Sequence, residues 1–305
     1  MITKRYKVYK NFGKCLELTN GEIKALITVD VGPRIIFYGY KGYNVLYEDI
    51  LRTMNKGGEF FDKNFKVGEK WYVYGGHRLW KATEDLKSYV PDNYPIKVVK
   101  TERGAIFAPH VQVLTGLQLT MTVEMNDDGS LDILESFKNM STNAQNVAPW
   151  GITAMRQGGT EIIPLNTTDT GFLPNQNLVF WPYNNRQDKR FTLSTKYAVL
   201  RQTKRYSEAF KISLFNHYGW SGYAVGKYFY LRKFKVTNGN YTDYHSNYET
   251  YVNGDYLEAE VMGEMTKLEA GAEVLLAERF EIYNDISFES FSDDGIDKAL
   301  NGRIL

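Results

Sequence analysis

Residues 117–137 read LQLTMTVEMNDDGSLDILESF, and this stretch decides the fold class. Apolar residues occupy every second position of residues 117–125, and polar residues fall between them. Because successive side chains of a β-strand point to opposite faces, the alternation predicts a half-buried strand. Residues 126–129 (NDDG) have hairpin-turn composition, and a second strand is predicted from Leu131 to Phe137.

The same pattern recurs along the chain. Residues 22–29 alternate in the same way, and Asn-Gly pairs such as Asn253-Gly254 punctuate the strand-like runs. Other runs typical of strands are residues 34–38, 106–107, 191–195, 224–225, 229–234, 256–261 and 274–283. Helical periodicity is weak, so we expect only a turn or two at residues 84–88 and a short helix from a Ser292 cap to Ala299.

Many short strands with regular turn signals predict an all-β sandwich or barrel. The chain has 305 residues and no low-complexity tract or Pro/Gly-rich linker, so we interpret residues 1–305 as a single domain with large sheets. Residues 56–68, which contain Gly57-Gly58, predict a mobile loop over a site.

Composition excludes several classes of protein. Lys plus Arg number 37 and Asp plus Glu 36, so the near-zero net charge argues against a broad nucleic-acid or anionic-membrane surface. Cys15 is the only cysteine, which excludes a disulfide-stapled module. The sequence shows no signal-peptide pattern and no long apolar run, and we therefore expect a cytoplasmic protein. We expect a monomer or homodimer.

Aromatic residues are abundant, with 23 Tyr, 17 Phe and 5 Trp. Aromatic side chains favour strands. They also line sugar sites, because the C–H face of a sugar stacks on a ring while its hydroxyls need polar partners. Both readings remain open from composition alone.

Several motifs in a fixed order resemble the galactose-mutarotase-like superfamily, in a mutarotase-like branch related to aldose 1-epimerases. The motifs are residues 31–36 (VGPRII), 74–80 (YGGHRLW), 91–95 (PDNYP), 137–141 (FKNMS), 148–155 (APWGITAM), 248–251 (YETY), 257–260 (LEAE) and 268–271 (LEAG). The similarity runs from about residue 15 to 285. It implies a β-supersandwich of large antiparallel sheets with few short helices, and a small-molecule carbohydrate as ligand.

The resemblance also implies a chemistry. In aldose 1-epimerases a glutamate on a late strand takes the proton of the anomeric hydroxyl, and a histidine donates a proton to the ring oxygen. Glu260 matches that glutamate best, and Glu258 shares its strand face. Residues 148–153 (APWGIT) stand where the epimerases carry the histidine, so His77 is the candidate acid. This chemistry needs no metal and no cofactor.

Other candidates would position the sugar. Residues 74–80 are interpreted as a loop in which glycines allow close approach, Arg78 binds hydroxyls or a carboxylate, and Trp80 stacks. Further candidates for sugar binding are Arg34, Trp150, His217, Glu249 and Glu258. Each has an ordinary structural reading beside it, such as a surface salt bridge for Arg34.

Three functions fit these residues. The first is a carbohydrate-binding protein that acts as an aldose 1-epimerase-like mutarotase, an isomerase that interconverts sugar anomers. The second is a non-catalytic sugar-binding or sensor protein. The third is a polysaccharide lyase- or glycosidase-like enzyme on the same scaffold, in which Glu249 and Glu260 would be the paired carboxylates.

Overall fold

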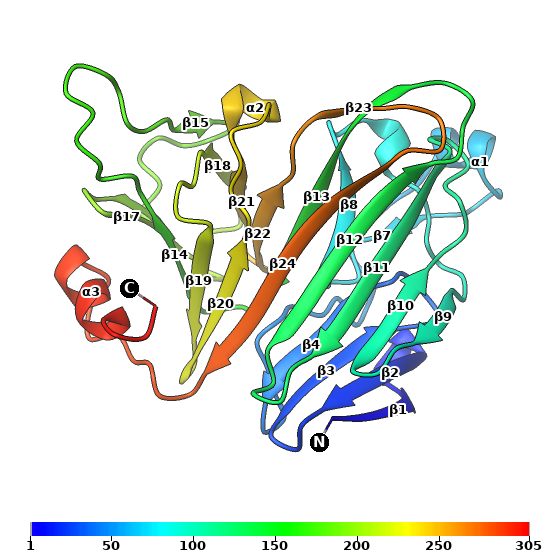
Figure 1. The fold of residues 1–305 in the computed structure, drawn as a ribbon, viewed down its shortest axis with the longest axis horizontal. Coiled ribbons are helices and arrows are strands. Elements are labelled where there is room, and N and C mark those ends of the chain that lie inside the picture. Colours follow the sequence, from blue (N-terminus) through cyan, green and yellow to red (C-terminus); the bar gives the residue numbers. More distant parts are fainter. Residues whose placement is uncertain (1, 305) are drawn as a thin grey trace.

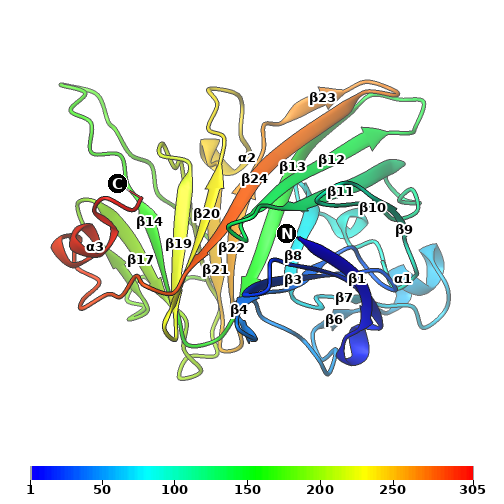
Figure 2. The ribbon, with the colours of Figure 1, turned by 60° about the horizontal axis from the view of Figure 1, so that its bottom comes forward.

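The computed structural model describes residues 2–304 and consists mainly of two large antiparallel sheets that face each other (Figure 1). A separate two-stranded sheet, β6 with β7, lies beside them. Both large sheets contain strands from the two halves of the chain. Figure 2 shows the N-terminal strands at one side of the molecule and the last helix, α3, at the other.

The first sheet has twelve strands in the order β1-β2-β3-β4-β8-β13-β22-β21-β18-β15, with β5 paired to β4 and β23 paired to β13. Its strands are β1 (Thr3–Val8), β2 (Lys14–Thr19), β3 (Ile23–Thr28), β4 (Ile35–Tyr40), β5 (Tyr43–Asn44), β8 (Gly76–Ala82), β13 (Gln145–Met155), β15 (Val179–Phe180), β18 (Phe210–Leu214), β21 (Tyr248–Val252), β22 (Leu257–Met262) and β23 (Thr266–Leu268).

The second sheet has ten strands in the order β16-β17-β14-β19-β20-β24-β12-β11-β10-β9. Its strands are β9 (Lys97–Lys100), β10 (Gly104–Ala108), β11 (Leu117–Met125), β12 (Leu131–Asn139), β14 (Thr160–Pro164), β16 (Phe191–Leu193), β17 (Tyr197–Arg201), β19 (Trp220–Val225), β20 (Tyr228–Phe234) and β24 (Glu273–Tyr283). The small sheet pairs β6 (Asn55–Lys56) with β7 (Trp71–Tyr72).

Helices are few and short. They are η1 (Lys10–Phe12), α1 (Glu59–Asn64), η2 (Leu86–Ser88), α2 (Thr242–His245) and α3 (Asp293–Leu300), where η marks a 3-10 helix. None of the helices within residues 2–304 has the length and apolar character needed to cross a membrane.

The hairpin and the last helix agree with the sequence predictions. Strand β11 has the predicted bounds, and its residues alternate between buried and partly exposed positions. It pairs antiparallel with β12 along its whole length, from Leu117 opposite Asn139 to Met125 opposite Leu131. The hydroxyl of Ser292 accepts a hydrogen bond from the backbone N–H of Gly295 and caps α3 as expected.

The prediction of a loop at residues 56–68 was wrong in part. Helix α1 occupies the middle of this stretch, and its Phe61 is buried among Trp71, Trp80 and Trp150. Burial of one aromatic anchor stabilises a six-residue helix that has little intrinsic helical tendency.

The main core lies between the two large sheets. It contains apolar side chains from the first sheet, such as Leu16 and Ala259, and from the second, such as Met121 and Phe280. Strand β13 lies in the middle of the first sheet, and its residues from Val147 to Met155 are all buried. One face of the first sheet therefore packs on the second sheet, and its other face is also covered.

Candidate functional site

A cavity of about 640 Å³ opens on the covered face of the first sheet, opposite the main core. Its volume lies in the range of about 300–1,000 Å³ that is typical of ligand pockets. Strands β8, β13, β18, β21 and β22 supply its floor, while β6, β7 and the segment after β15 add further lining residues. Aromatic residues form a large part of the lining: Trp71, Trp80, Tyr89, Trp150, Trp181, Tyr183, Tyr251 and Tyr256.

Strand register places the polar residues of the floor in a row. Ile152 of β13 pairs with Arg78 of β8 on one side and with Glu260 of β22 on the other. Glu260 in turn pairs with Glu249 of β21. Paired residues of antiparallel strands point to the same face, so these side chains lie on the cavity side of the sheet.

Lys211 links the two carboxylates. Its Nζ atom lies 2.6 Å from Oε2 of Glu249 and donates a hydrogen bond of 3.0 Å to Oε2 of Glu260. The same ammonium group lies 4.7 Å and 4.9 Å from the ring centres of Trp150 and Trp181. Two carboxylates and two aromatic faces therefore hold this cation at the cavity.

Burial shifts the protonation of all three groups. It raises the pKa of Glu260 to about 7 and the pKa of Glu249 to about 8, although Lys211 acts in the opposite direction on both. Burial lowers the pKa of Lys211, but attraction to the two glutamates outweighs it, and the pKa lies above its ordinary value. Near neutral pH the cluster therefore combines a cationic lysine with carboxyl groups that exchange protons.

Arg78 forms a second ion pair on the floor. Its Nη2 atom donates to Oε1 of Glu258 at 3.1 Å. The guanidinium carbon lies 5.6 Å from the ring centre of Trp71 and 5.2 Å from that of Trp80. One cavity is thus lined by five of the candidates that were predicted from the sequence: Arg78, Trp80, Trp150, Glu258 and Glu260.

His77 does not face this cavity. Residues 76–82 form strand β8 and not the predicted loop, so alternation sends His77 to the side opposite its neighbour Arg78. Its register partner Thr153 likewise lies one residue from Ile152, which faces the cavity with Glu260. The expectation of an acid–base pair of His77 with Glu260 is therefore not met.

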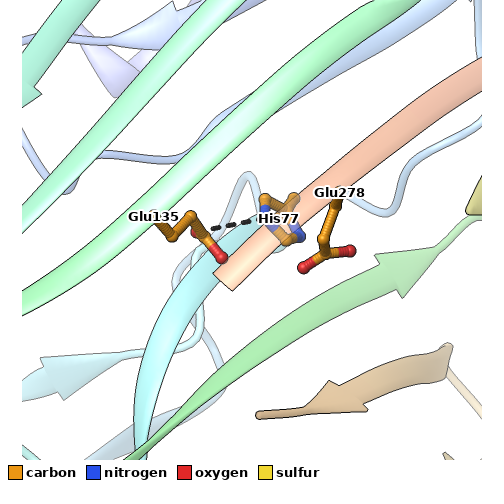
Figure 3. Close-up of side chains that lie close together, drawn as sticks. All are labelled: His77, Glu135 and Glu278. Carbon is orange, nitrogen blue, oxygen red and sulfur yellow. Dashed lines mark hydrogen bonds and ion pairs between the residues drawn. The ribbon is translucent and has the colours of Figure 1, made fainter. Parts of the chain in front are cut away.

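His77 instead belongs to a buried polar cluster between the sheets (Figure 3). Its Nδ1 atom lies 2.9 Å from Oγ1 of Thr153, and its Nε2 atom lies 3.2 Å from Oε1 of Glu135. Burial lowers the pKa of His77 to about 3 and raises the pKa of Glu135 to about 8. Both pKa shifts agree with a neutral imidazole whose Nε2 atom accepts a hydrogen bond from the protonated carboxyl group of Glu135.

Within residues 2–304, one group of side chains has the spacing to hold a metal ion: the ligand atoms of His77, Glu135 and Glu278 lie within 4.8 Å of one another. Glu278, however, already pairs with Arg232, which also donates to the carbonyl oxygens of Ala259 and Gly151 at 2.6 and 2.8 Å. With Glu135 protonated, the charges of Arg232 and Glu278 balance. The cluster is therefore electrically neutral as a structural network, although Oε2 of Glu135 and Oε1 of Glu278 are buried without a hydrogen-bond partner among the described residues.

Arg34 and His217 lie elsewhere. The Nη2 atom of Arg34 lies 2.6 Å from Oδ2 of Asp92, and Arg34 lines a separate cavity of about 270 Å³. His217 is exposed on the loop after β18, where its ring centre lies 4.7 Å from that of Phe215. Glu249 reaches the site through Lys211.

Four residues that line the cavity were not among the candidates predicted from the sequence: Lys211, Trp71, Trp181 and Tyr251. Lys211 lies in FKISL, whose apolar and polar residues alternate like those of a half-exposed strand. Its burial depends on segments far away in the sequence, such as the one that contains Trp181. Once β21 and β22 are paired, Glu249 lies beside Glu260, and two neighbouring buried carboxylates indicate that a cation is needed.

No protein-family model matches the chain, and no curated protein matches its sequence. Solved structures do match. A galactose mutarotase-like protein from Lactobacillus casei superposes with a TM-score of 0.55 at 12% identity, over 88% of this chain and 100% of that one. A galactose mutarotase-like protein from Clostridium acetobutylicum superposes with a TM-score of 0.54 at 13% identity, over 93% of this chain and 99% of that one.

The chain has the galactose-mutarotase-like fold. The predicted β-supersandwich is thereby confirmed. A TPR-domain containing protein from Parabacteroides distasonis superposes with a TM-score of 0.60 at 14% identity, over 89% of this chain and 47% of that one. At these identities the likeness describes the fold, and the function has to be argued from the site.

Proposed function

We propose that this protein binds a monosaccharide in the cavity of the first sheet and interconverts its anomers, with Glu260 as the base. The observation that carries the proposal is the position of Glu260, whose pKa is about 7, in a cavity lined by aromatic residues. A base with such a pKa is half deprotonated near neutral pH and still accepts a proton readily.

The rest of the cavity supports a carbohydrate ligand. Trp150 and Trp181 offer flat apolar faces to the C–H side of a sugar ring. Arg78 and Glu258 offer a donor and an acceptor for its hydroxyl groups. Aromatic rings and paired charges on one cavity floor suit a sugar, which has an apolar C–H face and polar hydroxyl groups.

Sugar binding without catalysis is the second candidate. Among the residues lining the cavity in the described part of the chain, 2–304, there is no histidine, and Glu260 is tied to Lys211. The glycosidase-like alternative has less support, because Glu249 and Glu260 approach the same ammonium group and do not flank a space for a glycosidic bond.

Anomer exchange measured by saturation-transfer NMR tests the proposal. Wild type and Glu260→Gln are compared across a panel of aldoses and uronic acids, with sugar binding followed by calorimetry. We expect wild type to accelerate exchange for at least one sugar, with a rate that rises with pH around about 7. We expect Glu260→Gln to lose about 100-fold or more of that rate. Sugar binding without acceleration would support the second candidate, and absence of both would refute the proposal.

A further inference from the structure

We infer that Lys211 is the proton donor of this site, acting as the acid to the Glu260 base. The inference rests on the proposed function of the same cavity. It starts from the contact between the two side chains, in which the Lys211 ammonium lies 3.0 Å from Glu260 and both residues line the cavity.

The distance suits the reaction. In a pyranose the anomeric hydroxyl oxygen O1 and the ring oxygen O5 are bonded to the same carbon, C1. A base for one oxygen and an acid for the other must therefore be close neighbours on the same side of the sheet. Lys211 and Glu260 meet this condition, whereas His77 points into the space between the sheets.

Other cationic groups of the floor do not suit the role. Arg78 is paired with Glu258, and a guanidinium group does not release a proton in proteins. An ammonium group does release one when its surroundings change. Lys211 is the ionisable cation that contacts the base directly.

The two carboxylates give Lys211 a way to become acidic at the right moment. In the reactive form of the site Glu249 and Glu260 are both ionised, and both stabilise the ammonium ion. When Glu260 accepts the proton from the sugar, one of these two negative charges disappears. The remaining attraction to Glu249 is weaker than that of the pair, so proton loss from Lys211 becomes easier as the ring opens.

The step is balanced. The O1–H bond breaks and its proton goes to Glu260, while the released electron pair forms the C1–O1 double bond. The C1–O5 bond breaks, and O5 takes a proton from Lys211, which becomes a neutral amine. After rotation about the bond to C1, O5 attacks the other face of the carbonyl carbon, returns its proton to Lys211, and O1 regains a proton from Glu260.

Two substitutions separate proton donation from charge. Lys211→Met removes both, and Lys211→Arg keeps the positive charge beside Glu249 and Glu260 but cannot donate a proton. Exchange rates and Michaelis constants are measured by NMR with the sugar that wild type turns over fastest. Lys227→Met, at an exposed turn, is the matched control.

We expect both Lys211 variants to lose about 100-fold or more in turnover while the Michaelis constant changes less than about fivefold. The control should keep the wild-type rate. If Lys211→Arg keeps more than about a tenth of that rate, Lys211 acts through its charge and the inference is refuted, while the proposed function stands.

A wild-type protein that binds sugars without exchanging their anomers would refute the donor role and leave a binding protein. Should Lys211→Met fail to fold, the double variant Lys211→Met/Glu249→Gln removes one of the two buried carboxylates that lose their cation. Retention of turnover by this double variant would refute the inference as well.

Discussion

Replacement of Glu135 by glutamine tests the protonation of the buried cluster. Glu135 lies at 0% exposure beside a neutral His77, and burial raises its pKa from 4.5 to about 8. Glutamine has nearly the same shape as a protonated glutamic acid, and its amide can donate to Nε2 of His77 as the carboxyl O–H does. The substitution therefore removes the titration and keeps the hydrogen bond.

Proton uptake on folding determines whether the free energy of unfolding rises or falls with pH. Above about pH 4.5 the unfolded chain has an ionised Glu135, while the folded protein keeps it protonated up to about pH 8, so folding binds a proton and rising pH destabilises the folded state. One bound proton changes the free energy of unfolding by about 1.4 kcal/mol per pH unit. Between about pH 5 and pH 7 wild type should lose about 3 kcal/mol relative to Glu135→Gln.

Urea unfolding of both proteins at several pH values measures this difference. Contributions of titrating groups far from residue 135 cancel in the comparison because both proteins share them. His77 contacts residue 135, but burial lowers its pKa to about 3, so it stays neutral in the folded protein between about pH 5 and pH 7. A difference that stays constant within about 0.5 kcal/mol over this range would refute a protonated Glu135. That result would mean that Glu135 is ionised in the folded protein as it is in the unfolded chain.

Two further predictions concern the core and the cavity. Arg232→Met should lower the free energy of unfolding by about 3–5 kcal/mol, because Glu278 is left as an unpaired buried charge. Urea unfolding measures this loss. The double variant Arg232→Met/Glu278→Gln should recover part of it, because it removes the unpaired charge. Trp181→Ala should weaken sugar binding by about fivefold to twentyfold, the equivalent of about 1–2 kcal/mol of lost ring contact. Calorimetry measures the affinity, with the exposed Phe172→Ala as control, and equal affinities for the two variants would contradict a stacking role for Trp181.

Strands with one exposed face were predictable from the sequence. In β11 the outward positions keep polar residues because they meet solvent, so the period of two is visible over the whole strand. Strand β8 was not predictable in this way. Its residues from Gly76 to Trp80 are all buried, because one side faces the second sheet and the other faces the cavity. Burial of both faces removes the alternation that identifies a strand.

The candidate site was predictable in part for the same reason. Glu258 and Glu260 share a face at a spacing of two residues, which any strand enforces. The opposite orientations of His77 and Arg78 follow from the same rule, but only once residues 76–82 are known to form a strand. A loop, which the glycines before His77 suggested, would have allowed both side chains to point toward one ligand.

Local sequence patterns were sufficient to predict the all-β class, the hairpin of residues 117–137, the cap of the last helix and the two acidic residues on one strand face, because each depends on neighbours within a few positions of the chain. Only the tertiary structure decided that Lys211 joins Glu249 and Glu260, and that His77 joins Glu135. These contacts depend on the order of strands across the sheets and on what covers each face. Residues 49 positions apart, such as Lys211 and Glu260, meet because β18, β21 and β22 are adjacent strands.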